Sequence, residues 1–246
     1  MAIELLIVQT DSTYPEVVSE QGDYADWFKG SIDTDDVNVT VVDCLRNALP
    51  DATEFDAVIL AGSSHSVNEP LPEIDALRAW AKQLVVLQTP TLGVCFGHQI
   101  LTTVAGGAVG RHAMGRQFGS AEVHLTDAGR DDFLFEGVEP NCHVHVCHED
   151  HCTVLPSGVT LLAASDRTPA HSFAIGANVR TVQFHPEASP ALMGSLRCAL
   201  QARQLVSDRG SEHDPTNRNA AGLRILANFL RHAKVHREAT LLGNPN

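Results

Sequence analysis

Short apolar runs alternate with amphipathic segments through the first half of the chain. The runs are rich in β-branched residues and are short enough for buried strands, whereas the segments between them carry apolar residues at helical spacing. This alternation is typical of a parallel sheet covered by helices. It predicts strands over residues 3–8, 37–42, 55–60 and 91–94, and helices over residues 14–29, 70–84 and 97–104.

The second half of the chain changes to short strands separated by turns. Strands are predicted over residues 121–125, 142–146, 161–165, 171–175 and 179–184, followed by helices over 191–205 and 223–232. The polar stretch 207–219 between those helices is predicted to be a loop. We therefore expect an α/β fold with a flavodoxin-like, mostly parallel sheet flanked by helices. An antiparallel hairpin region is added to it, in a single domain over residues 1–246.

Composition excludes some classes of partner. Seventeen Lys and Arg against thirty Asp and Glu give a formal net charge of -13, which repels phosphate backbones and anionic lipid. Neither nucleic acid nor a membrane is therefore expected as a partner. The N-terminal residues have no basic region before their apolar run, and no segment approaches the roughly 20 apolar residues that span a bilayer. We expect a cytoplasmic protein whose six cysteines are thiols.

One of those cysteines lies in a turn suited to chemistry. Residues 93–97 read Gly-Val-Cys-Phe-Gly between a predicted strand and a predicted helix, which is the arrangement of a nucleophile elbow with Cys95 at its tip. A helix that begins at this point stabilises a thiolate and supplies backbone N–H groups for an oxyanion. The alternative is that Cys95 is a small buried residue and that the glycines serve only a tight turn.

A second motif supplies the partners that a thiol nucleophile needs. His185 directly follows an apolar strand, so it is expected at the same rim of the sheet as Cys95. Pro186 restricts His185 to extended backbone and fixes the direction of Glu187 relative to the ring. The sequence therefore predicts a nucleophile, its base and a carboxylate that orients the base.

The two motifs, G-V-C-F-G-H-Q at 93–99 and Q-F-H-P-E at 183–187, resemble those of the class I (triad) glutamine amidotransferases. The similarity extends over nearly the whole chain. It is closest to the glutaminase domain of GMP synthases and to stand-alone proteins similar to that domain. The resemblance implies that Cys95 forms a γ-glutamyl thioester, that His185 is the general base and acid, and that Glu187 orients His185.

The same resemblance extends to the residues around the nucleophile. It implies an oxyanion hole formed by the backbone N–H groups of Phe96 and Gly62. Gln99 matches a position beside the bound glutamine, with an ordinary helix residue as the alternative. Cys-His-Glu-Asp at 147–150 looks like the family's S-H-x-D stretch, which holds the α-amino and α-carboxylate ends of glutamine. The substrate contacts so implied are Gln99, His148 and Asp150.

Two positions depart from the family's pattern. Cys147 stands where the S-H-x-D stretch has Ser, and Gln117 stands where the family usually has Glu. Both departures leave the proposed triad untouched and concern the substrate contacts and the acceptor.

A cluster of histidines and cysteines over residues 142–152 is the strongest competing signal, because thiolates and imidazoles are ligands that zinc prefers. In a strand, His143, His145 and Cys147 share one face, but such ligands lie roughly 6–7 Å apart and rarely close a tetrahedron alone. The spacing also lacks the paired C-x₂-C or H-x₃-H motifs of familiar sites. Neither a metal nor another cofactor is therefore expected.

The expected function is hydrolysis of the glutamine side-chain amide, which releases glutamate and ammonia for an acceptor that the sequence does not identify. The chain contains no phosphate-cradling G-x-x-x-x-G-K-[ST] loop, so for nucleotide amination a separate synthetase subunit would be needed as partner. Stand-alone hydrolysis of γ-glutamyl amides or peptides needs the same three residues and is the alternative.

Two further classes rank lower. A DJ-1/PfpI-like enzyme has its histidine directly after the nucleophile, whereas His98 lies three residues from Cys95. A regulatory binding module on the same fold is the non-enzyme alternative, and the intact set of Cys95, His185 and Glu187 argues against it.

Overall fold

The computed structural model describes residues 2–32, 35–206 and 218–243 of the 246-residue chain. Its strands are β1 (Ile3–Gln9), β2 (Val37–Asp43), β3 (Ala57–Leu60), β4 (Thr91–Val94), β5 (Ala108–Arg111), β6 (Gln117–Leu125), β7 (Asn141–His148), β8 (Asp150–Val154), β9 (Thr160–Ala164), β10 (Ser172–Ile175) and β11 (Val179–Val182). Its helices are α1 (Pro15–Gln21), α2 (Tyr24–Ser31), α3 (Pro72–Leu87), α4 (Phe96–Val104), α5 (Asp127–Arg130), α6 (Pro190–Ala202) and α7 (Ala220–Leu241), with short 3₁₀ turns η1 (Ala52–Glu54) and η2 (Phe133–Phe135).

Within the described residues, a nine-stranded sheet runs in the order β2-β1-β3-β4-β11-β10-β9-β6-β7, and β5 pairs with β8 in a separate two-stranded sheet. Strands β2, β1, β3, β4 and β11 are mutually parallel. Strands β10, β9, β6 and β7 continue the sheet through antiparallel pairs. The predicted α/β fold, a parallel sheet with an antiparallel extension, is thus confirmed.

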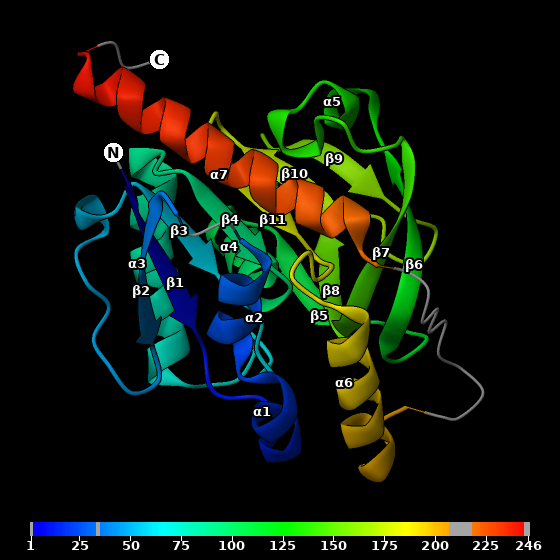
Figure 1. Cartoon of the computed structure of the whole chain (residues 1–246). Coiled ribbons are helices and arrows are strands. Elements are labelled where there is room, and N and C mark those ends of the chain that lie inside the picture. The colour runs from blue at the N-terminus through cyan, green and yellow to red at the C-terminus, as the bar shows by residue number, and fades with distance from the viewer. Residues whose placement is uncertain (1, 33–34, 207–217, 244–246) are drawn as a thin grey trace.

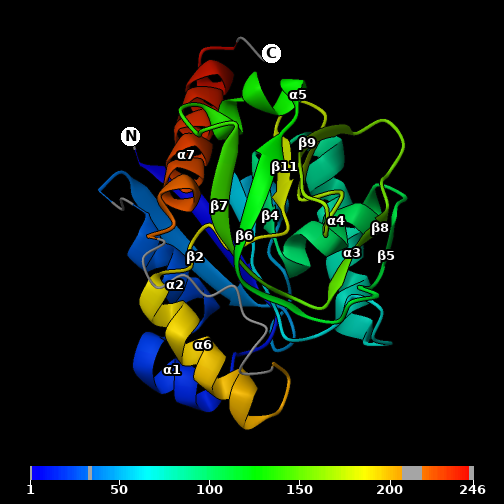
Figure 2. The same cartoon turned by 90° about the vertical axis from the view of Figure 1, so that its right-hand side faces the viewer.

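Helices cover both faces of the parallel strands. Helices α1, α2, α6 and α7 lie on one side of the sheet, and α3 and α4 lie on the other (Figures 1 and 2). Alternate side chains of β1 enter the two resulting cores, because successive strand residues point to opposite faces. Leu5 and Ile7 pack in the core that contains Phe28 of α2, and Leu6 packs in the core that contains Leu77 of α3.

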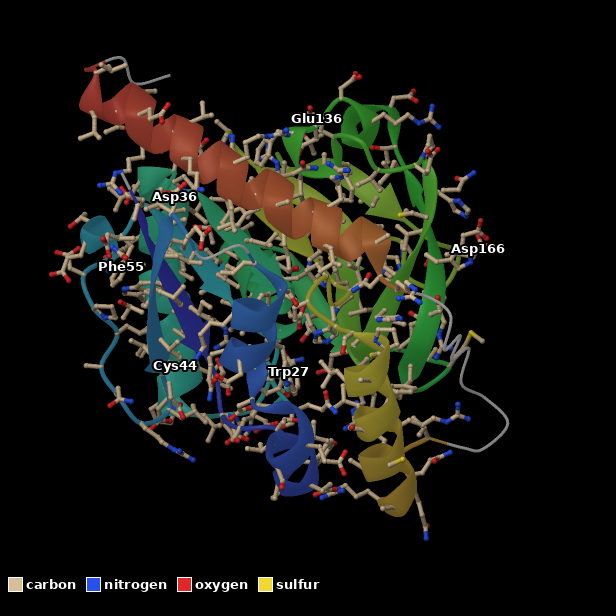
Figure 3. The ribbon with its side chains drawn as sticks, viewed as in Figure 1. Trp27, Asp36, Cys44, Phe55, Glu136 and Asp166 are labelled. Atoms are coloured by element: carbon tan, nitrogen blue, oxygen red, sulfur yellow. The ribbon has the colours of Figure 1, made fainter. Side chains whose placement is uncertain are left out.

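The single helix predicted over residues 14–29 is wrong, because the structure contains two helices there. Gly22 has a φ of 75°, a left-handed conformation that favours glycine and ends α1. Asp23 then begins α2 with a capping box, in which its side chain and that of Asp26 each bond the other's backbone N–H. This cap positions Tyr24 and Trp27, whose ring centroids lie 4.7 Å apart and which pack in the core. Figure 3 labels Trp27.

The antiparallel half of the sheet is larger than predicted. Strand β6 begins at Gln117 rather than at residue 121, because residues 117–120 pair with the C-terminal half of β7. Neither β5 nor β8 was predicted, since β5 contains Gly110 and its residues are at most half-buried. The pairing of β5 with β8 is important for the site described below, because it fixes the turn that follows His148.

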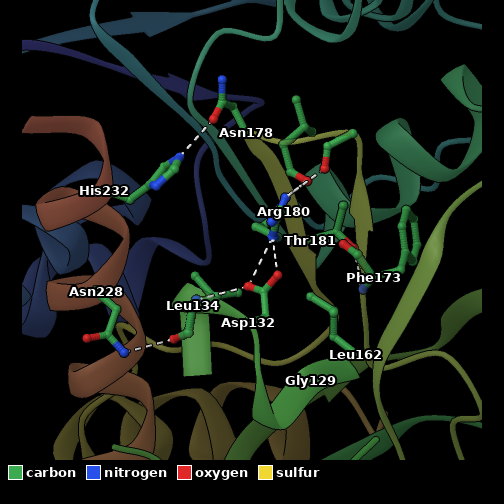
Figure 4. A network of polar contacts seen from close by, with 12 residues as sticks. Gly129, Asp132, Leu134, Leu162, Phe173, Asn178, Arg180, Thr181, Asn228 and His232 are labelled. Carbon is green, nitrogen blue, oxygen red and sulfur yellow. Dashed lines mark hydrogen bonds and ion pairs between the residues drawn. The ribbon is translucent and has the colours of Figure 1, made fainter. Parts of the chain in front are cut away.

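The last helix, α7, is much longer than the predicted 223–232. Its middle is held by polar contacts: His232 Nε2 lies 2.9 Å from Asn178 Oδ1, and Asn228 donates to the Leu134 carbonyl at 3.0 Å (Figure 4). Its C-terminal part is held by an ion pair of Arg237 with Asp56 at 2.8 Å. Contacts between distant segments therefore extend a helix whose own apolar spacing is weak. Most of the predicted 207–219 loop lies outside the described residues.

Arg180 and Asp132 form a buried ion pair in which the guanidinium Nε lies 2.9 and 3.0 Å from the two carboxylate oxygens (Figure 4). Their side chains are 7% and 9% exposed. The pair joins β11 to η2 at the end of the sheet away from β11's C-terminal residues. In the described part of the chain, no helix is long and apolar enough to cross a membrane.

Candidate active site

The turn between β4 and α4 places Cys95 in a strained backbone conformation, with φ 51° and ψ -97°. The flanking glycines are required by close packing, because a Cβ on Gly97 would lie 2.2 Å from the Leu60 carbonyl oxygen. The turn is tied to both neighbouring strands. Cys95 N–H donates to the Val182 carbonyl at 2.8 Å, and Gly97 N–H donates to the Ala61 carbonyl at 3.2 Å. The sulfur is thus held at the start of a helix.

We expect Gly97→Ala to destabilise the protein by about 3 kcal/mol, because the added methyl group meets rigid backbone and forces it to move. Equilibrium unfolding in urea measures this loss. Gly194→Ala is the matched control, since Gly194 lies inside α6 and a Cβ added there would point into open space. That control should be neutral or stabilised by about 0.5 kcal/mol. Equal stabilities of the two variants would contradict the packing argument.

His185 emerges beside Cys95 because β4 and β11 are adjacent parallel strands, with Val94 opposite Val182. Both strands therefore end at the same rim of the sheet. His185 Nδ1 lies 2.7 Å from Glu187 Oε1, and the Glu187 side chain is fully buried. His185 N–H donates to the His145 carbonyl at 2.8 Å, which fixes the backbone from which the ring projects.

Asn219 is a supporting residue that sequence reasoning missed. Its amide nitrogen lies 2.9, 3.1 and 3.0 Å from the carbonyl oxygens of His185, Pro186 and Ala188. One side chain therefore holds the whole turn that carries the histidine and the glutamate. An Asn before a helix is a common signal for a helix cap, but here the side chain makes no cap hydrogen bond, so no local pattern indicated this role.

The environment of His185 favours its charged form. Burial lowers the pKa of the ring, but the negative charges of Glu187 and Cys95, which both interact with it, outweigh burial and raise the pKa well above its usual range. A protonated imidazole beside the sulfur stabilises a thiolate. The arrangement therefore favours a protonated imidazole beside the Cys95 sulfur.

A pocket of about 130 Å³ opens at Cys95, smaller than the roughly 300–1,000 Å³ of sites for drug-sized ligands. Gln99, His148 and Asp150 line it, as do side chains of the loop after β3. Gln99 Nε2 donates to the Asp150 carbonyl at 2.8 Å, and His148 Nδ1 lies 3.0 Å from the same oxygen. Ser66 Oγ donates to the Asp150 carboxylate at 2.5 Å. Gln99 and His148 thus also hold Asp150 in place.

The family of the chain follows from comparison with known proteins. A model of the family described as glutamine amidotransferase class-I matches residues 26–202, a stretch that includes Cys95, His185 and Glu187. The chain belongs to the class I glutamine amidotransferases.

Relatives of this amidotransferase carry two different names. A subunit of the glutamine-hydrolyzing GMP synthase of Saccharolobus solfataricus is 33% identical over 135 residues, which are 54% of this chain and 68% of that protein. Gamma-glutamyl peptidase 5 of Arabidopsis thaliana is 29% identical over 188 residues, which are 74% of each protein. A crystal structure of a glutamine amidotransferase from Thermotoga maritima superposes with a TM-score of 0.73 at 19% identity. The superposition covers 95% of this chain and 98% of the Thermotoga maritima chain, and it shows that the two proteins share a fold.

The two amides expected to form the oxyanion hole of the amidotransferase come from neighbouring segments. Gly62 follows Ala61 and Phe96 precedes Gly97, and the Ala61–Gly97 hydrogen bond joins the two segments directly. A Cβ on Gly62 would lie 3.0 Å from His185 Cε1, so Gly62 lies against the imidazole ring of His185. A side chain larger than hydrogen would crowd the ring.

Three other histidines of the amidotransferase, His98, His143 and His145, do not line the pocket. His98 is fully buried, its Nδ1 lies 2.9 Å from Thr181 Oγ1, and burial lowers its pKa to about 3. It does not line the pocket, as a DJ-1/PfpI-like base would. His143 is exposed whereas His145 is buried with its Nδ1 2.9 Å from the Ala188 carbonyl. Across the described ranges, no group of three or more His, Cys, Asp or Glu is placed to hold a metal ion.

The two departures from the family's pattern lie in different places. Cys147 lines the pocket, and its carbonyl oxygen lies 3.8 Å from Cys95 Sγ. Gln117 is buried, accepts a hydrogen bond from Thr168 Oγ1 at 3.0 Å, and lines a separate hollow over β6. Only the Cys147 departure is therefore in a position to affect a substrate in the pocket.

Proposed function

We propose that this amidotransferase hydrolyses the γ-carboxamide of glutamine through a covalent intermediate on Cys95. The Cys95 thiolate adds to the amide carbon, and the backbone N–H groups of Phe96 and Gly62 stabilise the oxyanion. His185 gives its proton to the departing nitrogen, so ammonia leaves and a γ-glutamyl thioester remains. His185 then takes a proton from water, which attacks the thioester and releases glutamate. The observation that carries this proposal is the His185–Glu187 contact of 2.7 Å beside Cys95.

The pocket supports an amino acid as substrate. The Asp150 carboxylate and the Ser66 hydroxyl lie together on its wall and are suited to an ammonium group, and His148 lies beside them. Burial lowers the pKa of His148 well below its usual range, which keeps its ring neutral. We assign the α-amino end of the substrate to Asp150, with Gln99 and His148 as further contacts.

The fate of ammonia separates two versions of this function. One relative is named as a subunit of GMP synthase, so a separate synthetase subunit that receives ammonia is the partner we propose for amidotransfer. The second candidate is hydrolysis of γ-glutamyl peptides, because the pocket wall carries Arg116, which a free ammonia product does not need. Both versions use the same thioester.

The test is product release by the isolated chain, with glutamine and γ-glutamyl compounds as substrates. We expect stoichiometric glutamate and ammonia from glutamine. We also expect a glutamine-like diazo-ketone to label Cys95, as located by peptide mass spectrometry. Cys198 is exposed and provides an internal control for non-specific alkylation. Labelling of Cys198 in preference to Cys95 would refute the proposed nucleophile.

Glu187→Gln should shift the pH profile as well as lower activity. The carboxylate raises the pKa of His185, so its loss lowers that pKa and the ring loses its proton at lower pH. The protonated ring is needed for the leaving nitrogen, so the alkaline limb of kcat/KM should move toward acid. We expect kcat/KM at the pH optimum to fall by about 10², because general acid–base catalysis by His185 is weakened but not removed. An unchanged alkaline limb would show that Glu187 does not act through His185.

A further inference from the structure

Two guanidinium groups lie on the wall of the pocket that contains Cys95. Arg111 Nη1 lies 3.1 Å and Arg116 Nη2 lies 3.2 Å from the two carboxylate oxygens of Glu149. One carboxylate cannot neutralise two guanidinium groups, so the trio carries an excess positive charge. Of the other acids on the wall, Glu69 has its Oε2 2.6 Å from His65 Nδ1, and Asp150 accepts from Ser66 and is assigned above to the ammonium group of the substrate.

Arg116 is the better placed of the two for a substrate. Its side chain is 21% exposed, whereas that of Arg111 is 79% exposed. The Arg116 carbonyl accepts from Arg167 Nη2 at 2.9 Å, which helps to fix the backbone where β6 begins. A guanidinium on a fixed backbone that also contacts Glu149 loses little conformational freedom when it binds a ligand.

Cys147 lines the pocket together with Cys95 and Arg116. The Cys147 carbonyl lies 3.8 Å from Cys95 Sγ. Burial raises the pKa of the Cys147 thiol, and the positive charges of Arg116 and His185 both oppose this rise. The thiol is therefore near the guanidinium and the imidazole alike. His185 is proposed to protonate the departing nitrogen, so the leaving group of a substrate would pass through this part of the pocket.

Tyr14 adds a neutral donor to the same region. It lines the pocket, and its ring is covered by the Arg203 guanidinium at 4.2 Å, which Glu16 in turn binds. Burial raises the pKa of Tyr14, and the charge of Arg116 acts on it in the opposite direction. The phenol therefore keeps its proton near a guanidinium. A phenol and a guanidinium are both donors, and together they match a carboxylate.

We propose that Arg116 and Tyr14 bind the carboxylate of the leaving group, which makes γ-glutamyl peptides the preferred substrates of this site. The inference rests on the Cys95 chemistry proposed above. The C–N bond between the γ-carbonyl and the second amino acid breaks as the thioester forms, and His185 supplies the proton to that nitrogen. Water then cleaves the thioester, so one peptide and one water give glutamate and one free amino acid. The ammonia released from glutamine has no carboxylate, so only the peptide's leaving group offers one to Arg116 and Tyr14.

Binding to the Cys95→Ala protein tests the subsite without turnover. The probes are γ-glutamylglycine and its C-terminal amide, γ-glutamylglycinamide, compared by calorimetry. We expect the acid to bind at least about tenfold tighter than the amide, since a hydrogen-bonded charge pair contributes about that factor. Adding Arg116→Gln should remove this preference, and adding Tyr14→Phe should reduce it. Adding Arg111→Gln, the control on the same wall, should retain it.

Equal binding of acid and amide to Cys95→Ala would overturn the subsite, as would loss of the preference in Arg111→Gln but not in Arg116→Gln. Hydrolysis by the unmodified protein separates this failure from failure of the proposed function. Hydrolysis of both probes at equal kcat/KM would refute the subsite and support the Cys95 mechanism. A tenfold binding preference without hydrolysis of glutamine or either probe would refute that mechanism and support the carboxylate contact. Thermal unfolding of each variant distinguishes a local effect from misfolding.

Discussion

Cys95→Ala should abolish hydrolysis of glutamine and of γ-glutamyl compounds, with kcat/KM reduced by at least about 10⁴. The substitution removes the sulfur atom that forms the thioester. Among the described thiols that line the pocket, only Cys95 lies in a turn that begins a helix beside His185. Cys147 shares the pocket, but it belongs to β7 and lacks the backbone N–H groups of a helix start. Measurement of glutamate release under single-turnover conditions would detect residual activity.

The loss in Cys95→Ala should occur without loss of the fold. Alanine is smaller than cysteine, so it fits the same space. The positive φ at this position strains cysteine and alanine alike by about 1 kcal/mol, so the substitution adds no backbone strain. Cys198→Ala is the matched control, because Cys198 is exposed on α6, and it should retain full activity. Residual turnover above about a tenth of the native rate in Cys95→Ala would exclude this residue as the nucleophile.

The elbow could be predicted because its determinants are local. Gly93 and Gly97 bracket the cysteine, and the apolar runs on either side predict the strand and helix that the structure contains. The meeting of Cys95 with His185 could be predicted only as far as a shared rim. Its atomic basis is the register of β4 with β11, in which Val94 lies opposite Val182. The register between strands that are distant in the chain depends on side-chain packing across the sheet, which cannot be predicted from one sequence alone.

The parts that sequence did not predict depend on contacts between distant segments. Asn219 holds the His185 turn from a position more than thirty residues away in the chain. Tyr14 and Arg116 reach the pocket from positions far apart in the sequence, and each resembles an ordinary surface residue in its local context. The split between α1 and α2 was readable in principle, since Gly22 and the Asp23 cap are local signals. The apolar spacing across them concealed the break.

His185→Ala should lower kcat/KM by about 10³, the scale of losing a general acid and base in one residue. Without the imidazole, Cys95 has no neighbour to take its proton and the departing nitrogen has no donor. The effect on stability should be separate. Glu187 is fully buried, and its Oε2 has no hydrogen-bond partner within the described residues, so loss of the ring leaves a buried carboxylate without its cation. That should cost about 3 kcal/mol of unfolding free energy.

The double variant His185→Ala/Glu187→Gln distinguishes these two effects. Neutralising the carboxylate removes the buried charge, so urea unfolding should show that the double variant is more stable than His185→Ala alone. Its activity should remain at the level of His185→Ala, because the orienting residue has no ring left to act on and the two losses are not additive. A further fall in activity on adding Glu187→Gln would mean that Glu187 contacts the substrate directly. Recovery of activity together with stability would mean that His185 serves only the fold.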